Sequence, residues 1–91
     1  MNKERRKELE QAIHLLNGAQ EKLELAKEIV ENVKDEEEEA YENLPEGLQE
    51  SERGEAMQEN IDNLDNVISE LDDIYDNVEG QIDEVQGVID A

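Results

Sequence analysis

The sequence predicts an all-α protein, an antiparallel two-helix coiled-coil hairpin, on three observations. Apolar residues recur at alternating steps of three and four in both halves of the 91-residue chain. The one proline of the chain lies between the halves. When the chain is folded about Gly47, the apolar residues of the two halves face each other. Charged residues make up 40% and hydrophobic ones 35%, close to the composition of disordered proteins, so the regular spacing is what indicates a fold.

The first helix is predicted over about residues 3–42. Its apolar series runs from Leu9 to Leu44, and only Glu37 in that series is not apolar. A repeat of about 3.5 residues over several heptads is typical of a coiled-coil seam, and a strand cannot produce it. The series is Leu9, Ala12, Leu16, Ala19, Leu23, Ala26, Val30, Val33, Glu37, Ala40 and Leu44.

A turn is predicted over about residues 43–51. Pro45 has no backbone N–H and disfavours the helical conformation at Leu44, so the first helix should end near Glu42. Gly47 offers a positive φ for the reversal of the chain.

The second helix is predicted over about residues 52–90, with Ser51 as its N-cap. An alternative start places Pro45 at the first position of a helix, with Leu44 and Leu48 covering the end of the core. The seam of the second helix is Met57, Ile61, Leu64, Ile68, Leu71, Tyr75, Val78, Ile82, Val85 and Ile89.

The register follows from folding the chain about Gly47, which places Leu23 opposite Leu71. Small residues then face large ones, which fills the layers of the core. These pairs are Ala12–Ile82, Ala19–Tyr75 and Ala26–Ile68, and the polar rim on one side pairs Lys27 with Asp65 and Gln20 with Asp72. Residues 1–91 are therefore expected to form a single helical hairpin.

The other side of the seam carries extra apolar residues, here called the apolar flank: Leu15, Ile29, Val67, Ile74 and Val88. A two-helix hairpin buries little apolar surface and is marginally stable alone. The flank therefore favours a further packing surface, either for a second copy in a four-helix bundle or for a partner protein. The simpler interpretation is that these residues only widen the core.

The charge is strongly unbalanced, with 28 acidic against 8 basic residues and a formal net charge of -20. All the basic residues lie in the first 53 positions, and residues 54–91 contain twelve acidic ones. Along a helix this is one negative charge per about 4–5 Å, close to the spacing of about 3.4 Å in one DNA strand. The surface is thus expected either to imitate nucleic-acid phosphates or to be an ordinary solvated face.

The mimicry hypothesis assigns binding to an acidic strip of eight residues on the second helix: Asp62, Asp65, Glu70, Asp72, Asp73, Asp76, Glu79 and Asp83. The expected partner is the basic surface of a protein that handles nucleic acid. Direct binding to nucleic acid is not expected, because phosphates carry the same sign of charge.

The turn segment NLPEGLQESERGEAM, residues 43–57, is followed by acidic heptads. This combination resembles a family of small acidic helical proteins encoded by bacteriophages and prophages. The resemblance implies a cytoplasmic setting in a bacterial host. By analogy it also implies an inhibitor of host defence nucleases, such as an anti-CRISPR protein or a DNA mimic. It transfers no site residue.

Catalysis is not expected, and no cofactor or metal ion is implied. The chain has no cysteine and a single histidine, His14, and Gln11 stands where a di-iron Glu-x-x-His motif would need glutamate. No apolar run is long enough to span a membrane. The alternative function is a structural coiled-coil adaptor or assembly protein that binds through the apolar flank.

Overall fold

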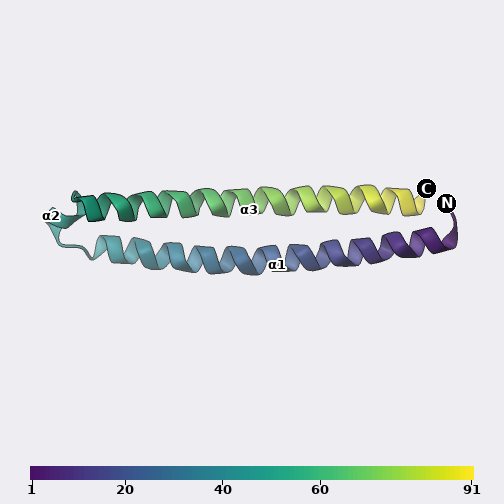
Figure 1. The fold of residues 1–91 in the computed structure, drawn as a ribbon, viewed down its shortest axis with the longest axis horizontal. Helices are drawn as coiled ribbons and strands as arrows, with labels where there is room; N and C mark the ends of the chain where they lie inside the picture. The colour runs from purple at the N-terminus through teal and green to yellow at the C-terminus, as the bar shows by residue number, and fades with distance from the viewer. The chain divides into compact units, whose positions relative to one another are not determined.

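The computed structural model describes residues 1–91, which form two long helices joined through a short one (Figure 1). Helix α1 spans Lys3–Glu42, α2 spans Glu46–Gln49 and α3 spans Glu52–Asp90. No strand is present. The bounds of the two long helices coincide with those expected from the sequence. Neither helix contains a stretch that is long and apolar enough to cross a membrane.

The connection between the long helices differs from the expected turn because it contains α2. Pro45, with φ -55° and ψ 145°, immediately precedes this helix, and its carbonyl accepts a hydrogen bond of 2.8 Å from the Leu48 N–H. Gly47 lies inside α2, and no glycine of the chain has a positive φ. The expected positive φ at Gly47 was therefore wrong. A helical turn started by proline reverses the chain without a left-handed residue.

The start of α3 is capped as expected. The Gly54 N–H, at the third position of the helix, donates to Ser51 Oγ at 3.4 Å, which is the geometry of a serine N-cap. The Ser51 hydroxyl in turn donates to the Leu48 carbonyl. Gly54 is buried, and a Cβ placed on it would overlap the Gln49 carbonyl oxygen. A residue without a side chain is required there for α2 and α3 to approach so closely.

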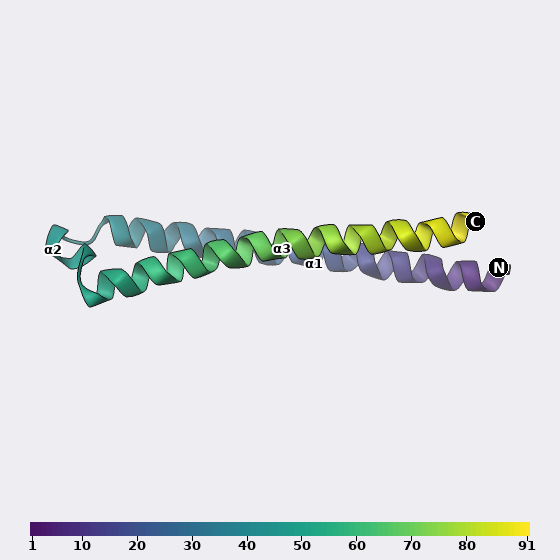
Figure 2. The ribbon, with the colours of Figure 1, turned by 90° about the horizontal axis from the view of Figure 1, so that it is seen from above.

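The chain divides into two compact units. The terminal unit comprises Met1–Leu25 and Asp72–Ala91. Its two helical segments run side by side in opposite directions (Figure 2). Two hydrogen bonds between them show this: Arg6 Nη2 donates to the Ala91 carbonyl, and Gln20 Nε2 donates to Glu79 Oε2. These distances are 3.4 and 2.8 Å. Gln20 is buried between the segments, and Ile82 is the buried hydrophobic residue of this unit.

The turn unit comprises Ala26–Leu71. Lys34 Nζ lies 2.6 Å from Asp65 Oδ1 and joins the α1 and α3 segments of this unit. Gln49 Nε2 donates to the Tyr41 carbonyl at 3.2 Å and fastens α2 to the end of α1. Ile61 is the buried hydrophobic residue of the turn unit.

Asp65 and Gln20, two residues of the predicted polar rim, make contacts other than the predicted pairs Lys27–Asp65 and Gln20–Asp72. Asp65 pairs with Lys34, and Gln20 donates a hydrogen bond to Glu79. In each case the observed partner lies one heptad from the predicted one. The lysine and glutamine side chains are long enough to reach the next heptad position, so seam spacing alone did not determine the pairs.

The seam of α1 also departs from the prediction within the turn unit. Ala26 and Ala40 are exposed and Val33 is 46% exposed, although all three were assigned to the seam. Lys34 and Tyr41, which follow in the heptad, are half-buried instead. Long amphipathic side chains can bury their apolar part while the polar end stays in solvent, which accounts for the partial burial of Lys34 and Tyr41.

Candidate partner-binding surfaces

The part of the acidic strip that lies in the turn unit is exposed. Asp62, Asp65 and Glu70 all have exposed side chains. Asp65 is held by Lys34, and Asp62 accepts a hydrogen bond of 3.2 Å from Gln58 Nε2 one turn away on α3. Glu70 has no hydrogen bond or ion pair within the chain, so its carboxylate is available to a partner.

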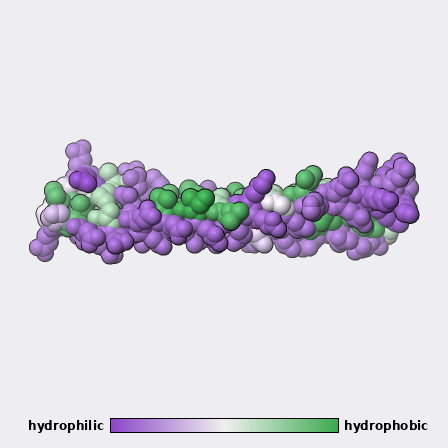
Figure 3. All heavy atoms as spheres, turned by 90° about the horizontal axis from the view of Figure 1, so that it is seen from below, coloured by the Kyte–Doolittle hydropathy of each residue, from purple (hydrophilic) through white to green (hydrophobic).

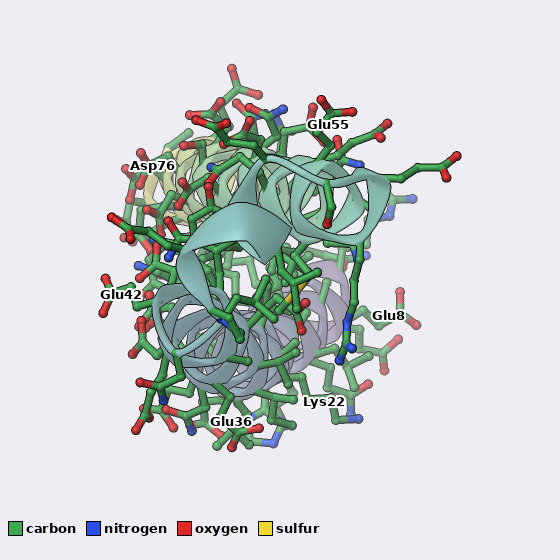
Figure 4. All side chains as sticks on the ribbon, turned by 90° about the vertical axis from the view of Figure 1, so that its left-hand side faces the viewer. Glu8, Lys22, Glu36, Glu42, Glu55 and Asp76 are labelled. Carbon is green, nitrogen blue, oxygen red and sulfur yellow. The ribbon has the colours of Figure 1, made fainter.

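The part of the strip in the terminal unit divides in two. Asp73, Asp76 and Asp83 are exposed and make no hydrogen bond or ion pair within the chain. Figure 4 shows Asp76 pointing away from the ribbon into solvent. Asp72 is half-buried and takes part in an interaction within the chain, and Glu79 accepts the hydrogen bond from Gln20. The outer carboxylates Asp73, Asp76 and Asp83 are thus free, whereas Glu79 also bonds to α1.

The two units differ in net charge. The turn unit holds 16 acidic and 3 basic residues, a net charge of -13. The terminal unit holds 12 acidic and 5 basic residues, a net charge of -7. Four of the five basic residues of the terminal unit are Lys3, Arg5, Arg6 and Lys7, and the turn unit contains the acidic run of residues 35–39. Negative potential is therefore strongest in the turn unit.

The environment of Lys34 clearly shifts its titration. The hydrogen bond to Asp65 is the main cause that raises the pKa of Lys34 above 10.5, and the charges of Asp65 and Glu38 add to it. Partial burial of the ammonium group acts in the opposite direction. Lys34 also lies 3.5 Å from Glu38 Oε1, so it neutralises part of the acidic surface around it.

All five residues of the apolar flank are exposed. Leu15 is 72% and Ile29 63% exposed, which is unusual for large aliphatic side chains. Sequence reasoning missed two further residues beside Ile29 on α1: Leu25, 60% exposed, and Val33. Their spacing of four residues on either side of Ile29 was the available signal. Figure 3 shows hydrophobic atoms exposed in patches between hydrophilic ones.

A shallow groove in the terminal unit holds the single histidine. His14 is exposed, and no cysteine or serine lies in the groove to be activated by it. The lining residues are His14, Asn17, Gly18, Gln20, Glu21, Glu24, Leu25 and Tyr75. No three or more His, Cys, Asp or Glu side chains are arranged to hold a metal ion. The lining residues offer hydrogen bonds and apolar contact.

Comparison with known proteins gives no relative on which to base a function. No protein-family model, curated protein or solved structure matches this chain.

Proposed function

We propose that the chain is an antiparallel coiled-coil hairpin that binds the basic nucleic-acid groove of a target protein and blocks it. One observation carries the proposal: α3 presents the exposed carboxylates Glu70, Asp73, Asp76 and Asp83, and residues 54–91 contain no lysine or arginine to neutralise them. The opposite direction of the helical segments in each unit supports the hairpin.

The physical basis is substitution of carboxylates for phosphates. A groove that binds nucleic acid gains most of its affinity from lysine and arginine side chains placed against regularly spaced negative charges. Unbalanced charge on a small protein opposes folding through self-repulsion. A basic partner removes that repulsion, so part of the electrostatic cost borne by the free chain becomes binding free energy. The resemblance to phage-encoded acidic proteins directs the proposal to host defence nucleases, including CRISPR nucleases, as the class of target.

Not every carboxylate of the acidic strip is suitable for testing binding to the target. Asp65 and Glu79 already accept bonds from Lys34 and Gln20, so their replacement would also disturb the helix pair. Asp73, Asp76 and Asp83 have no such role and are the residues to change. The matched control is Glu4, Glu8 and Glu10, which are three exposed carboxylates on α1.

The test is capture of proteins from a bacterial lysate by the immobilised chain, followed by elution with a DNA duplex. We expect nucleic-acid-binding proteins to be captured at about 0.05 M salt, released by DNA, and lost at about 0.5 M salt. The variant Asp73→Asn/Asp76→Asn/Asp83→Asn should capture much less, and Glu4→Gln/Glu8→Gln/Glu10→Gln should match the parent. Equal capture by parent and first variant would contradict the proposal.

A second candidate function is a coiled-coil adaptor, which the exposure of the apolar flank favours. Binding through apolar contact is nearly independent of salt and is not reversed by DNA. Partners retained at high salt, and lost from Val67→Ser or Ile74→Ser while helicity is kept, would support the adaptor and not the inhibitor.

A further inference from the structure

The groove of the terminal unit is large enough to hold a side chain of another molecule. Its volume is about 850 Å³, within the range of about 300–1,000 Å³ that is typical of binding pockets in proteins. Residues of α1 form most of its lining, and Tyr75 of α3 forms the rest. All of these residues belong to the terminal unit, so the groove is complete within one compact unit.

The groove contains a hydrogen-bond acceptor that the chain itself does not use. Gln20 lines the groove and is 6% exposed. Its Nε2 donates to Glu79 Oε2 and to the Tyr75 carbonyl, and these two acceptors fix the orientation of the side-chain amide. The other end of the amide, Oε1, accepts no hydrogen bond within the chain and is not sealed off from solvent. A ligand with an N–H donor can satisfy this acceptor.

The two acidic residues of the groove are also free. Glu21 and Glu24 lie one turn apart on α1, both are exposed, and neither forms a hydrogen bond or ion pair within the chain. Apart from His14, no basic residue lines the groove. Two carboxylates and an amide oxygen together favour a cation with several N–H donors.

The rest of the lining includes apolar and aromatic surface. Leu25 is 60% exposed, and Tyr75 supplies one of the two aromatic side chains of the chain. Gly18 leaves open space, because a Cβ there would meet no atom within 4 Å. An aromatic face attracts a cation, and the aliphatic stem of a long basic side chain can cover a leucine. A metal ion would leave this apolar surface unused.

We propose that the groove binds an arginine side chain of a partner protein, presented next to an apolar residue. The guanidinium group donates to Gln20 Oε1 and to the carboxylates of Glu21 and Glu24, and it stacks on Tyr75. Its five N–H donors lie in one plane, an arrangement that the ammonium group of lysine does not have. The neighbouring apolar residue covers Leu25.

A smaller cavity in the turn unit, of about 300 Å³, is less suited to the same ligand. It too is lined by a tyrosine and two glutamates, Tyr41, Glu38 and Glu42. Glu38 Oε1, however, lies 3.5 Å from Lys34 Nζ, so a cation of the chain itself already neutralises part of this lining. The arginine is therefore assigned to the groove of the terminal unit.

The first experiment titrates the isotope-labelled full chain with the blocked peptide Ala-Leu-Arg-Ala and follows the amide signals by NMR. Peptides with lysine or citrulline in place of arginine are the matched ligands, since lysine keeps the charge and citrulline keeps the shape. We expect the largest shifts at the Gly18 backbone amide and the Gln20 side-chain amide, with affinity falling from arginine to lysine to citrulline. Equal affinity for arginine and lysine overturns the guanidinium assignment. Equally large shifts at residues 35–39 overturn the site.

The second experiment changes the carboxylates of the groove. Glu21→Gln/Glu24→Gln alters two exposed side chains and should weaken binding of the arginine peptide about tenfold, because two ion pairs are lost. Glu4→Gln/Glu8→Gln removes the same charge from exposed positions of α1 outside the groove and should change the affinity less than about twofold. Equal losses in the two variants would show general attraction to an acidic surface and overturn the proposal.

The third experiment tests the aromatic contact. Tyr75→Phe keeps the ring and should retain the affinity for the arginine peptide, whereas Tyr75→Leu should lower it about two- to fivefold. Circular dichroism checks that both variants stay helical. Equal binding by the two helical variants would overturn the stacking on Tyr75.

The fourth experiment separates this inference from the proposed inhibition, on which it does not rest. Asp73, Asp76 and Asp83 do not line the groove, so Asp73→Asn/Asp76→Asn/Asp83→Asn should bind the arginine peptide as the parent does. Peptide binding by a parent that captures no DNA-releasable protein would support the groove and reject the inhibition. Loss of peptide binding in this variant would place the arginine on the acidic strip and overturn the assignment to the groove.

Discussion

Lys34 Nζ lies 2.6 Å from Asp65 Oδ1 and 3.5 Å from Glu38 Oε1, so one ammonium group joins α1 to α3 and also bridges one turn of α1. It lies where the sequence places the edge of the seam, next to the exposed Val33. This contact links the helix pairing of the turn unit to the pH of the solution.

The contribution of this ion pair should disappear only in strongly alkaline solution. In the unfolded chain Lys34 titrates near 10.5, and the hydrogen bond and charge of Asp65 raise its pKa in the folded chain. The stabilisation is therefore complete below about pH 10.5 and is lost as pH rises through the folded pKa. We expect the difference in unfolding free energy between parent and Asp65→Asn to be constant from about pH 8 to pH 10 and to shrink above that range.

The control for this measurement is Asp62→Asn, which removes the same charge from α3 at a residue that bonds to Gln58 and not to a lysine. Urea titrations of the three chains separate the ion pair from the general relief of repulsion. A difference between Asp65→Asn and Asp62→Asn that persists beyond the titration of lysine would show that Lys34 is not the cause.

Two glycine substitutions should change stability in opposite directions. A Cβ at Gly54 would overlap the Gln49 carbonyl oxygen and lie 2.6 Å from the Leu48 carbonyl oxygen, and backbone atoms cannot yield as side chains do. Gly54→Ala should therefore lower the free energy of unfolding by about 1–3 kcal/mol. Gly80 lies inside α3, where a Cβ would meet no atom within 4 Å, so Gly80→Ala should raise it by about 0.5–1 kcal/mol. Thermal denaturation followed by circular dichroism measures both, and a neutral Gly54→Ala would contradict the close approach of α2 and α3.

The ends of the helices could be predicted because their signals are local. Pro45 stops α1 within a few residues, and Ser51 caps α3 whatever lies beyond it. The features that were not predicted depend on contacts between residues that are distant in the sequence. Whether Val33 or Lys34 is the more buried residue depends on how α1 is rotated about its axis in the turn unit. Because the two residues are adjacent in the sequence, the heptad pattern does not determine that rotation. The need for glycine at position 54 arises from the carbonyl of Gln49, a contact that sequence spacing does not show.

The residues that form the two candidate surfaces could be predicted from the sequence, but which of them are free to bind a partner could not. Counting charges identified the acidic strip, and the heptad positions identified the apolar flank. Which carboxylates are free was not predictable, because Asp65 and Glu79 meet Lys34 and Gln20 only in the folded chain. The target of the strip is set by the shape and charge of another molecule, and a single sequence holds no record of that molecule.

The buried side chain of Gln20 should stabilise the terminal unit through its hydrogen bonds. It is 6% exposed, and its side-chain amide donates to Glu79 Oε2 at 2.8 Å and to the Tyr75 carbonyl at 3.4 Å. Gln20→Ala removes both bonds and leaves a gap between the segments, so the free energy of unfolding should fall by about 1–3 kcal/mol. Gln11→Ala, at an exposed position of α1, should change it by less than about 0.5 kcal/mol.

The bond to Glu79 can be separated from packing by a double-mutant cycle with Glu79→Ala. If the hydrogen bond to the carboxylate contributes to stability, the effects of Gln20→Ala and Glu79→Ala should fall short of additivity by about 0.5–3 kcal/mol. Additive effects would mean that Gln20 stabilises the unit through packing alone. In that case Glu79 would be as free as Asp76, and it would belong with the outer carboxylates as a residue available to a basic partner.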